Sequence, residues 1–227
     1  MIGGAAAVGD AAAVSLDDLR REALRMLDGV PEGDPLDEAT VALIAVAVRA
    51  APTVLDTDGV QHYAELALDA GATGEQVHET LLLVAGLGFH TLAEGSRRVA
   101  EILNRRGDGL PALDRRRLQL RERRVGRDAY WSRLEVETPG FLEALLRLSP
   151  EGFEAFISFV GVPWRSGALR PAVKELICIA ADATSGHRYR PGMRLHVANA
   201  LHLGVGRAAV LEALSIAAAA PAHRGVA

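Results

Sequence analysis

An internal repeat constrains the fold of this chain more than any other feature of its sequence. Residues 36–90 align with residues 169–223 without a gap at a constant offset of 133, with 15 identities in 55 positions. The matches include Gly71 with Gly204, so glycines recur in the same register as the apolar positions. Repeats of this kind are typical of one supersecondary unit that buries its apolar face against a second copy. We therefore predict that one helical hairpin motif occurs twice.

The hydrophobic pattern within each unit is helical. Apolar residues recur every three or four positions, and no segment outside short loops alternates with period two. This spacing predicts helices over 37–50, 60–70 and 74–87, with Gly71 as a C-cap. Aromatic residues make up only 4% of the chain, so we expect a core of small and aliphatic side chains between closely packed helices. The predicted fold class is all-α, with two tandem repeats and connecting helices.

The expected domain organisation follows from the repeat and from the breaks around it. We expect a disordered tail (residues 1–14), a first repeat unit (15–106), a helical connector (107–168) and a second repeat unit (169–227). The connector contains an arginine-rich segment, 113–127, whose charge is partly balanced by acidic residues. We interpret this segment as a solvated helix, with an anion or partner site as the alternative.

Charge and cysteine content exclude several classes of protein. The net charge of −4 and a pI near 6.0 provide no overall attraction to nucleic acid or to an anionic membrane. No uninterrupted apolar run reaches about 18 residues, and the first 14 residues lack the basic start of a signal peptide. The single cysteine, Cys178, excludes an internal disulfide and a Cys-x-x-Cys site. We therefore expect a cytoplasmic protein that binds neither nucleic acid nor a membrane.

The second unit carries the residues that suggest chemistry. Glu175, Cys178 and Asp182 fall on one stripe of an otherwise apolar helix, and His196 lies on the next helix. Imidazole titrates near neutrality, and a carboxylate can fix its tautomer or share its proton. Glu175 and His196 are therefore the predicted catalytic pair. The structural alternatives are an ion pair of Glu175 with an arginine, a satisfied interior histidine, and a buried Cys178 that acts as a small hydrophobe.

The loop between these helices supplies the candidate substrate-binding residues. They are His187, Tyr189 and Arg190, together with Asp182, and a guanidinium suits a substrate carboxylate. A metal set of His187, His196 and Asp182 has only weak spacing, so we predict neither a metal nor another cofactor.

The first unit lacks the catalytic pair. Ala42 and Tyr63 occupy the positions that correspond to Glu175 and His196, so this unit is predicted to serve as scaffold or pocket wall. His90 matches His223 at the end of each unit, and both are interpreted as structural caps or interface groups.

The second unit resembles a known family. The run ELICIAADATSGHRYRPGMRLHVANALHLGVGRAAVLEAL is similar to the carboxymuconolactone decarboxylase and alkylhydroperoxidase-D superfamily, over about residues 169–223 and more weakly over 36–92. The shared pattern is an E-L-I-x-I-A helix, a loop, a His-bearing helix, an A-L-x-x-G turn and an E-x-L helix. Where the peroxidase branch has Cys-x-x-Cys, this chain has His187 and Arg190, so thiol peroxidase chemistry is not expected.

The resemblance implies a fold, an assembly and an activity. The fold would be the helical one of this superfamily, assembled as a homo-oligomer such as a trimer or dimer. His196 stands two residues beyond the family spacing, which a longer loop explains, and Glu175 and His196 carry over as the functional pair. The implied activity is a cofactor-independent decarboxylase, isomerase or lactone hydrolase that acts on a small carboxylated or lactone substrate. The alternatives are a non-catalytic ligand-binding or structural oligomer and a residual redox role through Cys178.

Overall fold

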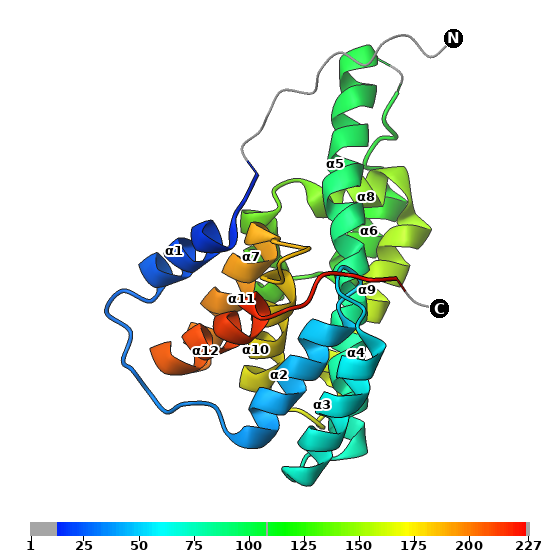
Figure 1. The fold of residues 1–227 in the computed structure, drawn as a ribbon. Helices are drawn as coiled ribbons and strands as arrows, with labels where there is room; N and C mark the ends of the chain where they lie inside the picture. The colour runs from blue at the N-terminus through cyan, green and yellow to red at the C-terminus, as the bar shows by residue number, and fades with distance from the viewer. Residues whose placement is uncertain (1–12, 108, 226–227) are drawn as a thin grey trace.

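The computed structural model describes residues 13–107 and 109–225, and every regular element in these ranges is a helix (Figure 1). The prediction of an all-α fold is therefore confirmed. The helices, in chain order, are α1 (Leu16–Met26), α2 (Glu38–Ala50), α3 (Thr57–Asp69), α4 (Gly74–Ala85), the short 3-10 helix η1 (Gly86–Gly88), α5 (Phe89–Arg106), α6 (Arg115–Arg124), α7 (Ala129–Glu137), α8 (Phe141–Leu148), α9 (Pro150–Arg165), α10 (Pro171–Asp182), α11 (Arg190–His202) and α12 (Arg207–Ala218). None of them is long and apolar enough to cross a membrane.

Most of the predicted tail, residues 1–12, lies outside the described residues. Val14, which was predicted to belong to that tail, instead packs against the main hydrophobic core. Its carbonyl oxygen accepts a hydrogen bond of 2.9 Å from Nη1 of Arg188. Tertiary contacts therefore include a residue before the N-cap of α1, Ser15, whose side chain accepts a hydrogen bond from the backbone of Asp18.

The helices of the two repeat units begin at corresponding positions. Helices α2, α3 and α4 start at residues 38, 57 and 74, and α10, α11 and α12 start 133 residues later, at 171, 190 and 207. Gly71 and Gly204 follow α3 and α11 with φ values of 93° and 80°, the left-handed conformation that favours glycine at a helix end. These spacings support the predicted duplication, which stays a prediction.

Helices α2 and α10 form the centre of the molecule. They pack against each other, and each also contacts α4 and α12 (Figure 1). Ile44 and Ile177, which the repeat aligns, are both completely buried in the shared core. Truncating such a buried isoleucine to alanine typically costs about 2–5 kcal/mol of stability. The matched apolar positions therefore form one core rather than two separate ones.

The predicted connector contributes a second core. Phe141, Phe153 and Phe156 are buried between α5, α8 and α9. Helix α7, which was not predicted as a separate helix, adds Trp131 to this cluster. The side chain of Asp128 caps α7 by accepting a hydrogen bond from the backbone N–H of Tyr130. Since α7 contacts α11 and α9 contacts α4, this core packs beside both repeat units.

A buried ion pair joins α4, α9 and α10. Nζ of Lys174 lies 2.7 Å from Oε1 of Glu79, and both side chains are at most 3% exposed. The ammonium group also donates hydrogen bonds to the backbone carbonyls of Pro163 and Ser166, at 2.6 and 2.7 Å. The ammonium group is therefore paired with a carboxylate and hydrogen-bonded to two carbonyls, which is how a charge can be retained in an apolar core.

The segment between α1 and α2, which we call the strap, lies across the start of α12. Backbone N–H groups of Arg207 and Ala208 donate to the carbonyls of Pro31 and Glu32, at 3.0 and 2.9 Å. The backbones approach so closely that a Cβ on Gly206 would lie 2.6 Å from the carbonyl oxygen of Glu32. Carbonyl groups of the strap therefore cap α12 in place of a side chain.

Candidate functional site

Glu175 and His196 meet in the interior of the second unit. Nδ1 of His196 lies 2.6 Å from Oε2 of Glu175, and both residues are buried between α10 and α11. Because this hydrogen bond occupies Nδ1, the second ring nitrogen, Nε2, is the one left for a ligand. Among the described residues, Nε2 has no hydrogen-bond partner.

The carboxylate also changes the proton affinity of the imidazole. Burial disfavours the charged ring, but the charge of Glu175 and its hydrogen bond outweigh burial and raise the pKa of His196 above its ordinary value of 6.5. A histidine with a raised pKa is a stronger proton acceptor, and the imidazolium that forms can return the proton.

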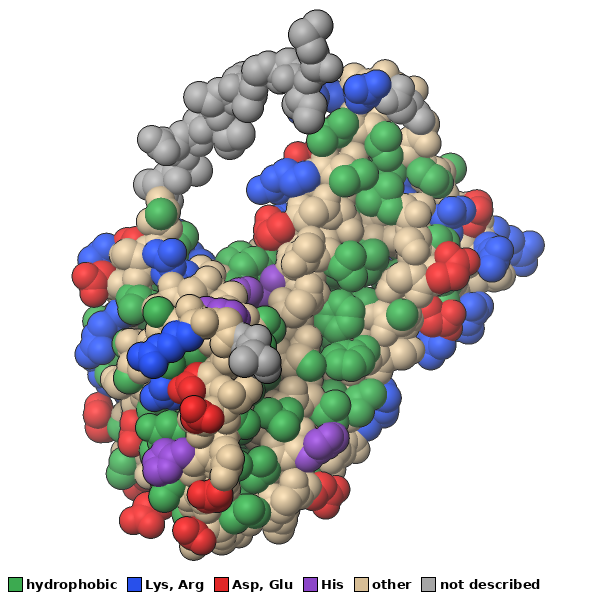
Figure 2. Space-filling model, turned by 45° about the vertical axis from the view of Figure 1, so that its right-hand side comes forward, with side chains coloured by type: hydrophobic (Ala, Val, Ile, Leu, Met, Phe, Trp, Pro, Cys, Tyr) green, Lys and Arg blue, Asp and Glu red, His purple; other side chains and the backbone are tan. Residues whose placement is uncertain are grey.

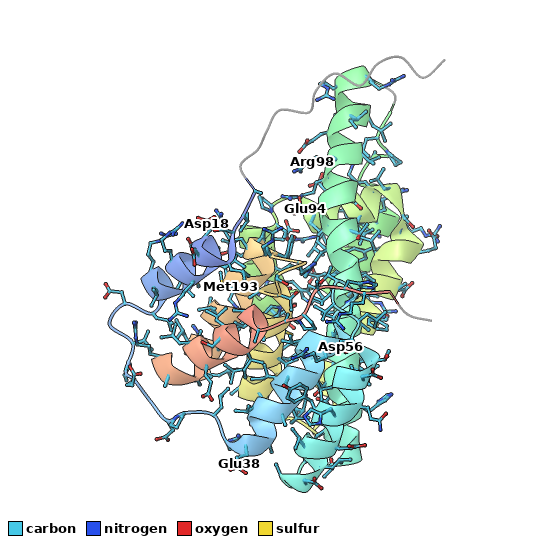
Figure 3. The ribbon with its side chains drawn as sticks, viewed as in Figure 1. Asp18, Glu38, Asp56, Glu94, Arg98 and Met193 are labelled. Carbon is cyan, nitrogen blue, oxygen red and sulfur yellow. The ribbon has the colours of Figure 1, made fainter. Side chains whose placement is uncertain are left out.

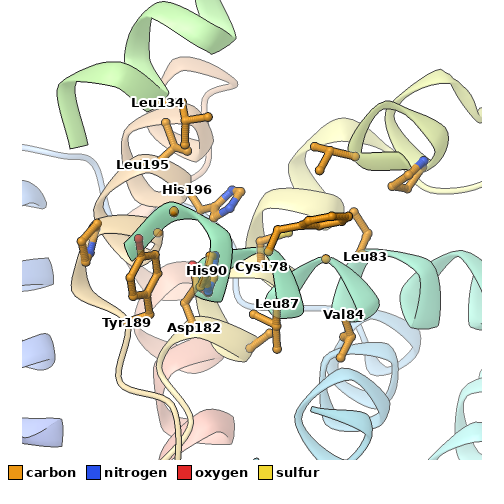
Figure 4. A pocket seen from close by; sticks show the side chains of 18 of the residues that line it. Leu83, Val84, Leu87, His90, Leu134, Cys178, Asp182, Tyr189, Leu195 and His196 are labelled. Atoms are coloured by element: carbon orange, nitrogen blue, oxygen red, sulfur yellow. The ribbon is translucent and has the colours of Figure 1, made fainter. Parts of the chain in front are cut away.

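A cavity of about 90 Å³ adjoins His196 (Figure 4). Helices α4, η1, α5, α7, α8, α9, α10 and α11 line it, mainly with apolar side chains such as Leu83, Leu87 and Leu134. The polar groups on its wall include His196, Asp182 and Tyr189. A space of this size admits a few water molecules or a small organic molecule. Glu175 is not part of this wall, so it acts on the cavity only through His196.

Asp182 places a carboxylate on the cavity wall. It is only 1% exposed, and its Oδ2 has no hydrogen-bond partner within the described part of the chain. Burial raises the pKa of Asp182 to about 7, although the charge of His196 acts in the opposite direction. A Cβ on Gly192 would lie 2.1 Å from Oδ2, so only glycine leaves room for this carboxylate at the start of α11.

Two histidines from different parts of the chain lie beside Asp182. Nδ1 of His90, at the start of α5, is 2.7 Å from Nε2 of His187, in the loop before α11. Burial, with repulsion from His187 and His196, lowers the pKa of His90 to about 3, and burial also lowers the pKa of His187. Both rings are therefore neutral at pH 7 and keep a lone pair for a ligand.

The predicted substrate-binding residues lie in different environments. Asp182 and Tyr189 line the cavity, whereas His187 lies behind His90 and is not part of the wall. Arg190 is exposed at the first position of α11 and lies outside both the cavity and the groove beside it. The structure therefore brings together four of the six candidates, Glu175, His196, Asp182 and Tyr189, with His187 in a supporting position.

Three further residues at the site were not singled out from the sequence. His90 was interpreted as a cap or interface group, whereas its match, His223, is exposed in the structure. Tyr130 lines the cavity from α7, the helix that was not predicted, and the burial of its hydroxyl raises its pKa. Arg133, one turn further along α7, donates from Nε to Oδ1 of Asn199 at 2.5 Å.

A second space, which we call the outer groove, lies on the other side of the Glu175–His196 pair. Glu175, Arg133 and Asn199 line it, and Tyr130 and Trp164 separate it from the cavity because they line both. Arg133 therefore provides, beside Glu175, the guanidinium that was expected from Arg190.

Cys178 lines the cavity, and along α10 it stands between Glu175 and Asp182. Burial, followed by the negative charges of these two carboxylates, raises the pKa of its thiol well above the ordinary value. Since the thiolate is the reactive form, this environment argues against the redox alternative.

The corresponding place in the first unit holds different chemistry. Ala42 and Tyr63 line an open groove, and the guanidinium of Arg49 lies 5.3 Å from the centre of the Tyr63 ring. Arg49 and Asp56, which stand where the second unit has Asp182 and Tyr189, form an ion pair of 3.0 Å. The described part of this groove contains no carboxylate–histidine pair.

Comparisons with known proteins identify the family to which the chain is similar. The model of the carboxymuconolactone decarboxylase family matches residues 150–223, a region that begins with α9. A crystal structure from Burkholderia xenovorans LB400, described as a candidate gamma-carboxymuconolactone decarboxylase subunit, is 37% identical in sequence. The similarity covers 91% of this chain and 84% of that one, with a TM-score of 0.68. No curated protein matches the sequence. The matched region and the identity over nearly the whole length show that this chain belongs to the carboxymuconolactone decarboxylase family.

Proposed function

We propose that the chain is a cofactor-independent acid/base enzyme, a decarboxylase, isomerase or lactone hydrolase that acts on a small lactone or carboxylated substrate. The observation that carries this proposal is the buried hydrogen bond of 2.6 Å between Glu175 and His196, with the histidine ring on the wall of a cavity. The family membership supports the same class of chemistry.

The proposed mechanism uses the free nitrogen of His196. Neutral His196 accepts a proton at Nε2 from a substrate carbon or from an attacking water, and the carboxylate of Glu175 stabilises the imidazolium that forms. The imidazolium then returns the proton to the product. The apolar wall strengthens the interaction between the two charges, because it excludes the water that would screen them.

The charges around the site suggest how a substrate is oriented. Among the described residues that line the cavity there is no arginine or lysine, so the cavity suits an uncharged lactone ring better than a carboxylate. The guanidinium of Arg133 lines the outer groove, which Tyr130 and Trp164 separate from the cavity, so a substrate carboxylate would reach it only if these two side chains moved aside. The non-catalytic alternative would use the same two spaces for binding alone.

The pH dependence of turnover provides the test. With a panel of small lactones and carboxylated lactones, turnover should rise with pH through the pKa of His196, because only neutral imidazole accepts a proton. Glu175→Gln removes the charge that raises this pKa, so the rising limb should move to lower pH while maximal turnover falls. The proposal would be contradicted if the rising limb of the pH–turnover curve stayed at the same pH in this variant, or if no compound of the panel were turned over.

We also propose that the chain forms a homo-oligomer, such as a trimer or dimer, through α5. Leu92, Val99 and Ile102 lie on one stripe of this helix and are 36–45% exposed. In Figure 2, hydrophobic side chains gather on the face turned toward the viewer, and acidic and basic side chains lie among them. Light scattering should give a mass of two or three chains. Ile102→Glu should lower this mass, whereas Val136→Glu, at an isolated exposed position on α7, should not. A monomeric native chain would refute this assembly.

A further inference from the structure

His90, His187 and Asp182 form a cluster with the composition and spacing of a metal site. One ligand atom from each lies within 4.8 Å of the other two. Oδ1 of Asp182 is 3.8 Å from Nδ1 of His90 and 3.9 Å from Nε2 of His187, and the two nitrogens are 2.7 Å apart. The residues come from α10, α5 and the loop before α11, so the cluster joins the two repeat units.

The cluster leaves a buried acceptor without a partner. Oδ2 of Asp182 has no hydrogen bond within residues 13–107 and 109–225, although the residue is 99% buried. Leaving such a group unsatisfied costs about 1–3 kcal/mol or more, especially when it is charged. The two imidazoles lie near Oδ1, the other oxygen of the same carboxylate, and no lysine or arginine lines this cavity in the described chain. A bound cation would compensate this carboxylate.

We propose that His90, His187 and Asp182 bind a divalent transition metal, with Zn²⁺ as the best fit, and that a fourth coordination position opens into the cavity. Two imidazoles and one carboxylate are ligands that Zn²⁺ accepts, whereas Mg²⁺ and Ca²⁺ prefer oxygen ligands alone. Tetrahedral bonds of about 2.0–2.1 Å separate ligand atoms by about 3.3 Å. The three observed distances, 2.7, 3.8 and 3.9 Å, lie on both sides of this value.

Binding requires only a small rearrangement of the two histidines. Their hydrogen bond would be replaced by two metal–nitrogen bonds, so the nitrogens would move apart by about 0.6 Å to reach tetrahedral spacing. The proton of that hydrogen bond would pass to the other nitrogen of the same imidazole, which leaves both rings neutral. His187 lies in a loop and is half-buried, so it can shift more easily than the buried Asp182.

Surrounding side chains hold His90 in place. The Tyr189 ring stacks on His90 with a centroid distance of 3.9 Å and an interplanar angle of 23°. The Tyr189 hydroxyl donates a hydrogen bond of 3.1 Å to Glu94, which in turn pairs with Arg97 and with Arg98 one turn away on α5 (Figure 3). The backbone N–H of Tyr189 donates to the carbonyl of Asp182 at 2.9 Å. Supporting contacts of this kind orient the ligands of metal sites.

This proposal goes beyond the acid/base function and does not depend on it, because neither Glu175 nor His196 is a ligand. His90, Asp182 and His196 all line the cavity, but His196 is not among the proposed ligands. Loss of turnover therefore does not test the metal site, and loss of metal binding does not test the catalytic pair.

Calorimetric titration with Zn²⁺ tests the proposal directly. The full-length, untagged chain is first treated with a chelator and dialysed, because a histidine tag would bind the same metal. We expect one equivalent of Zn²⁺ with a dissociation constant in the micromolar range or below. His187→Gln removes one ligand from a half-buried loop position and should weaken binding at least about 100-fold, more than the loss of a supporting contact. His62→Gln, an exposed histidine on α3, is the matched control and should bind as the native chain does.

A spectroscopic measurement with Co²⁺ identifies the ligands independently. The native chain should develop the visible absorption of tetrahedral Co²⁺, and both His187→Gln and Asp182→Asn should lose it while circular dichroism shows retained helix. Zn²⁺ should also raise the melting temperature of the native chain and not that of His187→Gln, because a metal that binds only the folded state stabilises it. Absence of Zn²⁺ binding at 100-micromolar concentration, or equal affinity of the native chain and His187→Gln, would overturn the proposal.

Discussion

Replacing His196 with alanine should reduce turnover by a factor on the order of 10² or more, the usual scale for the loss of an acid/base group. The variant lacks the nitrogen that faces the cavity, and it also leaves Glu175 buried without its partner. Initial rates per folded molecule, measured with a substrate from the lactone panel, provide the value. The exposed His62→Ala variant on α3 should retain native rates.

A second variant separates catalysis from stability in this experiment. His196→Gln keeps an N–H group that can donate to Glu175 but cannot take up a proton, so it should fold and still lose turnover. If both variants lower the free energy of unfolding and leave the rate per folded molecule unchanged, the pair is structural and the acid/base proposal fails.

Replacing Lys174 with methionine should lower the free energy of unfolding by about 3–5 kcal/mol. The substitution keeps a side chain of similar length but leaves the Glu79 carboxylate buried and unpaired between α4, α9 and α10. It also leaves the carbonyls of Pro163 and Ser166 without their donor. Urea unfolding followed by circular dichroism measures the change.

Two controls show whether burial is the cause. Arg170→Met removes an ion pair with Asp37 at 3.5 Å, in which the side chains are 76% and 59% exposed, and it should cost less than about 1 kcal/mol. The double variant Lys174→Met with Glu79→Leu removes both charges and should recover most of the lost stability. A cost for Lys174→Met no larger than that of Arg170→Met would show that the buried pair is not important for folding.

The sequence predicted the parts of the site that depend on local geometry. Glu175 and His196 lie on consecutive helices of one hairpin, so helical periodicity and the family pattern were enough to pair them. The fold class followed from the same periodicity. His90 could not be found in this way, because it reaches His187 across 97 residues of chain, through packing between the units.

Two other differences between prediction and structure have physical causes. Helix α7 has only nine residues, and its existence depends on the burial of Trp131 and on the Asp128 cap more than on helix propensity. Arg190 has the chemistry for binding a carboxylate, but the start of α11 turns it toward solvent. We predicted a guanidinium near the site from Arg190, and in the structure the guanidinium near the site is that of Arg133.

The strap over α12 has a consequence for the order in which the molecule folds. Besides its two carbonyl caps, the strap donates a hydrogen bond to a side chain of α12: the backbone N–H of Leu36 donates to the Glu212 carboxylate at 3.0 Å, across 176 residues of chain. Contacts between such distant segments form only after the cost of closing a long loop has been met. We therefore expect the first turn of α12 to be completed late, after the two ends of the fold have come together. Because Val210 and Ala213 of this helix are buried in the main core, we also expect α12 and that core to exchange their amide hydrogens as one cooperative unit.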